Sequence, residues 1–227
     1  MVRLDSSEEE LMARSQEWSI LAPLWASVVF LMFNACTRGR PKGRVIALSA
    51  ALATWVIVGL TFNLLEDWKL RIRAESRRAN CLSNLKQIGL AIALYADEYQ
   101  GRCPMDSANP TLLGSMQLLS NVLTSVYILV CPSDFRPNVR EEFYWRKVTP
   151  VNISYSYVPN LIWQSTPDSP LAADRIYSTS AGSVWPTDGN HKGQGGNVLF
   201  NDGHVAWNNR LPSALKDKDG KEVVLSP

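Results

Sequence analysis

The sequence is poor in the residues and motifs that most enzymes and nucleic-acid-binding proteins need. Only two of its 227 residues are histidine and four are cysteine, and the formal net charge at pH 7 is +2. It has no Gly-x-Ser-x-Gly motif, and no acid–base motif accompanies a cysteine, so nucleophilic catalysis has no support. Residues 79–227 hold twelve basic and thirteen acidic groups, which leaves no basic stripe for a nucleic acid. These absences argue against nucleophilic catalysis and against a nucleic-acid partner.

Uncharged runs are concentrated in the N-terminal third of the chain. Residues 45–65 carry no charge over 21 positions, which at ~1.5 Å per residue gives about 30 Å of helix, the thickness of a bilayer core. Residues 19–35 form a second uncharged run, and four basic groups in the connection, residues 37–44, favour a cytoplasmic loop. The sequence therefore predicts a transmembrane hairpin over residues 18–65 in the cytoplasmic (inner) membrane. The domain that follows would face the periplasm or the cell exterior.

A cleaved signal peptide is the alternative for the first uncharged run. Residues 1–17, however, hold two basic and five acidic groups, whereas a signal peptide begins with a basic region. We therefore expect a retained, acidic N-terminal segment over residues 1–17.

Beyond the second uncharged run the pattern predicts an amphipathic helix over residues 66–100. Between residues 66 and 97 there is one glycine and no proline, and apolar residues recur at alternating steps of four and three. These apolar residues are Cys81, Leu85, Ile88, Ile92, Tyr95 and Tyr99. Because nothing interrupts the preceding residues, we expect one helix of about 50 residues, continuous with the second span.

Residues 101–227 show short apolar runs separated by turn residues, which is typical of a small β domain. The expected strands are residues 126–130, 153–158 and 171–177, and a hairpin over residues 197–208. With a two-residue turn at Asp202-Gly203, Phe200 would face Val205 and Val198 would face Trp207, on the side buried against the helix. Residues 216–227 are charged, and we expect a loose tail there with at most a short edge strand.

The expected fold class is α+β. It combines the N-terminal transmembrane hairpin with a long helix, continuous with the second span, that packs on a small antiparallel sheet of three to five strands. The side chains expected to hold this helix on the sheet are Cys81, Leu85, Ile88, Ile92, Phe200, Val205 and Trp207.

The cysteines allow at most one internal disulfide beyond the predicted spans. Cys36 falls at the end of the first run, and we expect a reduced thiol there. Cys81, Cys103 and Cys131 are the disulfide candidates. A Cys103–Cys131 bridge and a Cys81–Cys131 bridge are both open, and buried free thiols are the third alternative.

The two histidines lie near acidic residues, in the one stretch that suggests a site. Asp188, His191, Asp202 and His204 are candidate ligands for zinc or another divalent metal. Asp174, Asn190 and Asn201 would add the hard oxygens that calcium needs. The spacing matches no known ligand signature, and Asp202 is also explained as a turn residue. We therefore expect no cofactor, with calcium as the alternative.

Three blocks of the chain together resemble bacterial prepilin-like proteins of the type II secretion pseudopilin group. The blocks are residues 77–104 (RRANCLSNLKQIGLAIALYADEYQGRCP), 130–134 (VCPSD) and 191–207 (HKGQGGNVLFNDGHVAW). The third block is similar to the ending of a subgroup in which a histidine, nine residues and Asp-Gly follow one another. Ten residues separate His191 from Asp202 here, and the prepilin cleavage motif is missing, since Gly43 is followed by Arg44.

The resemblance implies a helix half in the membrane and packed on a small sheet, in a protein that is not an enzyme. It further implies a structural or interaction role in a type II secretion-like or envelope assembly. Membrane, other pilin-like or secretion-apparatus proteins and further copies of this chain would then be the partners. The alternative function is a membrane-tethered protein that binds a divalent metal, either as a calcium-stabilised sensor or as a metallohydrolase.

Overall fold

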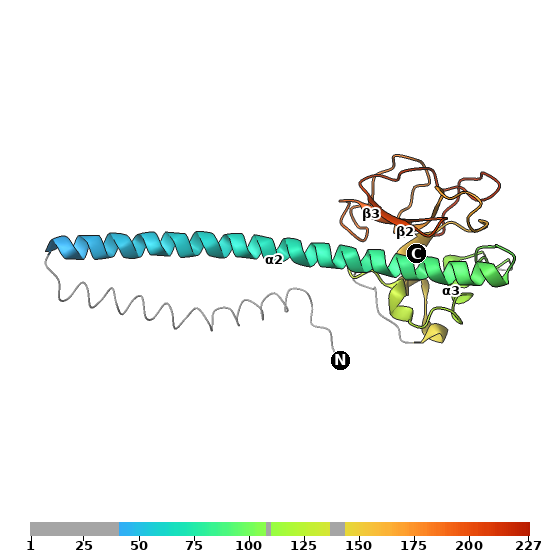
Figure 1. The fold of residues 1–227 in the computed structure, drawn as a ribbon, viewed down its shortest axis with the longest axis horizontal. Coiled ribbons are helices and arrows are strands. Elements are labelled where there is room, and N and C mark those ends of the chain that lie inside the picture. The colour runs from blue at the N-terminus through green and yellow to red at the C-terminus, as the bar shows by residue number, and fades with distance from the viewer. Residues whose placement is uncertain (1–40, 108–109, 137–143) are drawn as a thin grey trace. The chain divides into compact units, whose positions relative to one another are not determined.

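A computed structural model describes residues 41–107, 110–136 and 144–227 (Figure 1). The chain divides into two compact units, Met1–Leu70 and Arg71–Pro227. The second of these, called the C-terminal unit below, contains all four strands and the end of the long helix.

One helix, α2 (Pro41–Glu98), has 58 residues. Proline is tolerated in a first helical turn, where its missing N–H has no partner to lose, and no proline follows until residue 104. The helix ends where Gln100 and Gly101 adopt φ angles of 57° and 79°. The Gly101 amide donates to the Ala96 carbonyl at 2.8 Å, which satisfies one of the last helical carbonyls.

The predicted membrane spans need correction. The first, residues 19–35, lies outside the described residues. Within the described residues no helix is both long and apolar enough to cross a membrane. This finding contradicts the transmembrane hairpin and the placement in the inner membrane with an outward-facing domain.

The small antiparallel sheet is confirmed. Its four strands lie in the order β1-β2-β3-β4, and each pairs with the next in antiparallel fashion. The strands are β1 (Tyr155–Tyr157), β2 (Pro170–Asp174), β3 (Gly196–Phe200) and β4 (Val205–Asn208). Short helical segments precede the sheet: α3 (Leu112–Gln117), η1 (Val126–Leu129), η2 (Trp145–Lys147) and η3 (Pro150–Asn152).

The strand predicted at residues 126–130 is instead the 3-10 helix η1. Its backbone bonds are local, since the Val130 amide donates to the Tyr127 carbonyl at 3.1 Å. Asn84 of α2 then donates to the Val130 carbonyl at 3.0 Å. A short buried apolar run fits a helical turn as well as a strand, so its composition did not discriminate between the two.

The hairpin between β3 and β4 exists, but its register is shifted by one residue from the prediction. Val198 pairs with Ala206 and Leu199 with Val205, and the Phe200 amide donates to the His204 carbonyl at 2.9 Å. The turn therefore has three residues, with Gly203 at a φ angle of 90°. A one-residue shift exchanges the two faces of a strand.

Because of this shift, Leu199 rather than Val198 or Phe200 meets the helix. A Cβ atom at Gly89 of α2 would lie 2.8 Å from Leu199 Cδ1, so the glycine permits a close approach of α2 to β3. Cys81, Leu85, Ile88 and Ile92 are buried on this helix face, as expected, whereas Val205 and Trp207 are half-buried.

The C-terminal residues are not loose. Tyr157 and Leu225 exchange two backbone hydrogen bonds of 2.9 and 2.8 Å. Ser226 also donates from Oγ to the Ile176 carbonyl at 2.6 Å. The tail therefore contributes to the edge of the sheet beside β1.

Two leucines on α2 test the packing of the helix on the sheet. Leu85 is fully buried and Leu90 is 63% exposed. We expect Leu85→Ala to lower the free energy of unfolding by about 2–5 kcal/mol, because it leaves a cavity in the core. The matched Leu90→Ala change should cost less than about 0.5 kcal/mol. Urea denaturation of the full chain measures both, and equal losses would contradict the packing.

Candidate functional site

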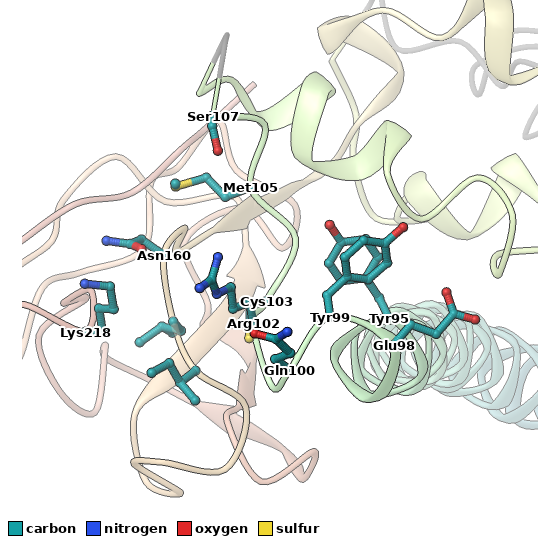
Figure 2. Close-up of a pocket in the computed structure, with 12 residues that line it drawn as sticks. Tyr95, Glu98, Tyr99, Gln100, Arg102, Cys103, Met105, Ser107, Asn160 and Lys218 are labelled. Atoms are coloured by element: carbon teal, nitrogen blue, oxygen red, sulfur yellow. The ribbon is translucent and has the colours of Figure 1, made fainter.

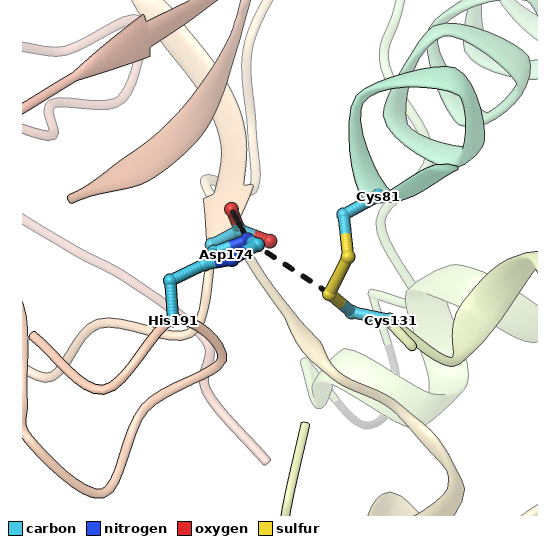
Figure 3. A group of neighbouring side chains, drawn as sticks. All are labelled: Cys81, Cys131, Asp174 and His191. Carbon is cyan, nitrogen blue, oxygen red and sulfur yellow. Dashed lines mark hydrogen bonds and ion pairs between the residues drawn. A yellow bond between two sulfur atoms is a disulfide. The ribbon is translucent and has the colours of Figure 1, made fainter. Parts of the chain in front are cut away.

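Four potential metal-ligating side chains meet between the helix and the sheet. They are Cys81 of α2, Cys131 after η1, Asp174 at the end of β2 and His191 in the loop before β3 (Figure 3). Their ligand atoms all lie within 4.8 Å of one another, and all four residues are buried. We call this group the buried cluster.

The structure joins Cys81 to Cys131 in a disulfide and leaves Cys103 as a buried free thiol. This decides between the two bridges that the sequence left open. The two residues are 50 positions apart in the sequence, and their Cα atoms are 5.0 Å apart. Closing a loop of this length stabilises the fold by about 4 kcal/mol in the chain-entropy model. The bridge ties α2 to the segment that follows η1.

The carboxylate of Asp174 is the polar centre of the buried cluster. Its Oδ2 atom accepts from the backbone amide of Asn197 at 2.7 Å and from the Asn197 side chain at 2.9 Å. His191 Nε2 lies 3.0 Å from the same oxygen. Oδ1 accepts from Asn190 Nδ2 at 2.9 Å. A buried charge of this kind is tolerated only when its lone pairs are satisfied, and here both oxygens have partners.

His191 connects the carboxylate to the disulfide and to Trp207. Its Nε2 atom lies 4.0 Å from Cys131 Sγ. The ring of Trp207 meets the imidazole edge-on with centroids 5.0 Å apart, and the Arg78 guanidinium lies 3.7 Å from the indole centroid. A Cβ atom at Gly195 would be 2.5 Å from Trp207 Cζ2. Glycine at this position therefore allows the indole to reach the histidine.

A second buried charge group lies near the first in sequence. Arg175 follows Asp174, and both Arg175 and Asp134 have fully buried side chains. Their closest atoms, Nη1 and Oδ1, are 3.6 Å apart, and Arg136 pairs with the same carboxylate at 2.7 Å. Arg175 also donates to the backbone carbonyl of Asp188. The Asp188 side chain itself is exposed.

The four metal ligands predicted from the sequence are not brought together. In the described part of the chain, only His191 among them belongs to a group of three or more potential ligands. Asp202 and His204 instead form a pair on the exposed turn of the hairpin, with Oδ1 and Nδ1 2.6 Å apart. The His204 amide donates to the Asp202 carboxylate and lowers its pKa.

Sequence reasoning missed the partners that His191 does have. The sequence suggests Asp174 as a calcium ligand, and Cys81 and Cys131 as partners in a disulfide or as buried thiols, but not as neighbours of His191. No local spacing connects these residues, because they come from a helix, a post-helical segment, a strand and a loop.

The closed disulfide limits what the buried cluster does chemically. Metals bind thiolates, and a disulfide sulfur is not one. Nε2 of His191 is also engaged with Asp174. In this state the cluster acts as a structural connection between α2, β2 and the loop before β3.

An open cavity of about 620 Å³ lies at the end of α2 (Figure 2). The rings of Tyr95 and Tyr99 stack there with centroids 4.1 Å apart, and burial followed by the neighbouring Tyr99 raises the pKa of Tyr95. Arg102 and Lys218 add two cationic groups to the wall. The described residues that line it include one carboxylate, Glu98, and no histidine, so the cavity offers no histidine–carboxylate pair for acid–base chemistry.

Comparison with known proteins gives one partial match. Residues 71–111 match the model of a family described as a protein of unknown function (DUF1559), which is associated with pilin-like proteins related to type II secretion. The match covers 41 residues, fewer than a fifth of the chain, and includes the whole of the first block that resembles prepilin-like proteins. No curated protein and no solved structure matches this chain.

The hydrogen bonds of Asp174 predict a large effect of its substitution. We expect Asp174→Asn to lower the free energy of unfolding by about 3–5 kcal/mol. The amide NH₂ group of the asparagine would replace one carboxylate oxygen, and it cannot accept the hydrogen bonds that buried N–H groups donate to that oxygen. Asp202→Asn, on the exposed turn, is the matched control and should cost less than about 1 kcal/mol. Urea denaturation of the oxidised full chain measures both changes. Similar losses for the two variants would show that Asp174 has no special role.

The buried thiol of Cys103 should be unreactive. Burial raises its pKa from 9.0 to about 12. At pH 8 the thiolate fraction is therefore about a thousandfold lower than for an exposed cysteine, and the thiolate is the form that iodoacetamide attacks. Peptide mass spectrometry should detect alkylation of Cys103 only after unfolding in urea. Rapid labelling in the folded chain would contradict this assignment.

Proposed function

We propose that this chain is a pilin-like protein with a structural or interaction role, and no enzymatic activity, in a type II secretion-like or envelope assembly. Two observations support the proposal. The family match over residues 71–111 falls on the C-terminal part of α2 and the turn after it. The C-terminal unit combines that helix with a small antiparallel sheet, as the resemblance implies.

The observation that carries the proposal is the exposed apolar surface of α2 in the first unit. Between residues 52 and 65 its large apolar side chains are exposed, except for the half-buried Trp55. The exposed ones are Leu52 (69%), Val56 (55%), Ile57 (59%), Val58 (46%), Leu60 (60%), Phe62 (37%), Leu64 (69%) and Leu65 (51%), and we call them the apolar segment. An exposed apolar surface of this extent marks an interaction site.

We infer that the apolar segment packs against the same segment of other copies or of related pilin-like chains. Side chains that recur every three and four residues on a helix form ridges, and such ridges fit the grooves of a neighbouring helix. Each buried side chain of this kind contributes about 1.5–3 kcal/mol. Several of them together provide enough free energy for a stable assembly.

The C-terminal unit supports a structural role by its chemistry. Its buried cluster is closed by a disulfide and by paired hydrogen bonds. The cavity beside Tyr95 is lined by both polar and apolar side chains, and no histidine is among the described residues around it. Both features fit a rigid module better than a catalytic one.

The oligomeric state of the full chain tests the proposal. We expect the wild-type chain to form oligomers, measured by size-exclusion chromatography with light scattering. The triple variant Ile57→Glu, Leu60→Glu, Leu64→Glu should shift it to monomer, because charged side chains cannot be buried at helix contacts without partners.

The triple variant Ser83→Glu, Gln87→Glu, Leu90→Glu is the matched control. It adds three acidic groups on one exposed face of the same helix, outside the apolar segment. We expect it to assemble like the wild type. A wild-type chain that is monomeric at all concentrations, or equal dissociation of both variants, would contradict the proposal.

A further inference from the structure

The buried cluster has the composition of a metal site whose two sulfur ligands are joined to each other. Two cysteines, a histidine and an aspartate place their ligand atoms within 4.8 Å of one another. Sulfur and imidazole nitrogen are preferred ligands of zinc, and a carboxylate completes a tetrahedral set. Metal ligands also need hydrogen bonds that hold them in place, and Asp174 has such bonds.

We propose that reduction of the Cys81–Cys131 disulfide converts the buried cluster into a four-ligand site for Zn²⁺. The ligands are the two thiolates, His191 Nε2 and Asp174 Oδ2. This inference concerns a state of the C-terminal unit and does not depend on the proposed assembly through the apolar segment.

The distances support this assignment. In a tetrahedral zinc site with bonds of about 2.0–2.3 Å, neighbouring ligand atoms are about 3.4–3.8 Å apart. Here Cys131 Sγ and His191 Nε2 are 4.0 Å apart, and Nε2 and Asp174 Oδ2 are 3.0 Å apart. Adjustments of less than 1 Å bring both pairs to the required spacing. The Cα atoms of the two cysteines, 5.0 Å apart, already place both sulfurs on the same side of the histidine (Figure 3).

The hydrogen bonds that hold Asp174 in place support the assignment independently. Carboxylates that ligate a metal are held in place by hydrogen bonds of their own. Asn190 and Asn197 donate to the two oxygens of Asp174 and fix the carboxylate plane. Asn190 is itself held, because it donates to the Ser154 carbonyl at 2.7 Å. The ligand arrangement therefore persists when the disulfide is opened.

The conversion balances in two steps. A dithiol reduces the bridge: the S–S bond breaks, each cysteine sulfur gains one electron and one proton, and the dithiol becomes a disulfide. The proton that His191 Nε2 shares with Asp174 moves through solvent to Nδ1, which leaves neutral His191 with a free Nε2 lone pair. Zn²⁺ then displaces the two thiol protons, which pass to solvent, and binds Nε2 and the Asp174 carboxylate. The bound ion replaces the lost covalent link between α2 and the segment after η1.

Cobalt binding to the full chain tests the proposal. A phosphine reductant opens the bridge by taking oxygen from water, and it leaves no thiol of its own to compete for the metal. We expect the reduced chain to bind one equivalent of Co²⁺ with a thiolate-to-cobalt charge-transfer band, and Zn²⁺ to displace it. The oxidised chain should show no such band. In a Cys36→Ser, Cys103→Ala background the same band should persist, since Cys81 and Cys131 are then the only thiols.

Two substitutions separate the ligands from the surface histidine. Loss of a residue that only hydrogen-bonds a metal ligand weakens metal binding by about 10–100-fold. Because His191 is a ligand itself, we expect His191→Ala to weaken cobalt binding by more than this. His204→Ala, on the exposed turn, should leave the affinity unchanged. Zinc should also protect Cys81 and Cys131 of the wild-type chain from alkylation, which provides a readout without any variant.

Three results would overturn the proposal. The first is the absence of a charge-transfer band in the reduced chain. The second is a band of full strength and affinity in His191→Ala. The third is a reduced chain that loses its near-ultraviolet circular dichroism and does not recover it on addition of Zn²⁺.

Discussion

The buried carboxylate of Asp174 is the constraint on which the C-terminal unit depends. An ionised group with 1% exposure needs donors from several directions, and they come from Asn190, His191 and Asn197. Two of these residues precede β3 and the third lies within it. One carboxylate therefore holds both the loop before β3 and the first part of that strand. The disulfide then fixes α2 against the same place through the 4.0 Å contact of Cys131 Sγ with His191. Helix, sheet and loop are thus held together at one buried polar centre.

Two glycines make this arrangement sterically possible. Gly89 lets Leu199 approach the helix, and Gly195 lets Trp207 reach His191. At Gly195 the φ angle of 149° is itself one that other residues rarely adopt. A larger side chain at either position would separate the layers that the carboxylate and the disulfide draw together. The disulfide, the hydrogen bonds of Asp174 and the ring contact of His191 with Trp207 therefore all lie at the buried cluster.

Periodicity in the sequence predicted the elements but not their long-range partners. The three- and four-residue spacing of Cys81, Leu85 and Ile88 identified the buried face of α2, because a helix repeats locally. The hairpin was found from Asp202-Gly203, yet its register was missed, since the Asn201 amide bonds the distant Ser169 carbonyl and extends the turn by one residue. The membrane prediction is wrong, since no described helix is both long and apolar enough to cross a membrane. The predicted metal ligands are also wrong, because Asp188, His191, Asp202 and His204 are close in sequence but only His191 lies in the buried cluster.

The side chains of α2 are buried to different extents in the two parts of the helix. In the C-terminal unit α2 buries one face and exposes residues such as Leu90 singly, which is normal for a folded domain. In residues 52–65 the large apolar side chains are exposed together. The core of the C-terminal unit is completed by residues of that unit, from α2, the four strands and the segments between them. The association that we propose and the redox change that we propose therefore concern different residues of the chain: the first involves the apolar segment, and the second involves Cys81, Cys131, Asp174 and His191.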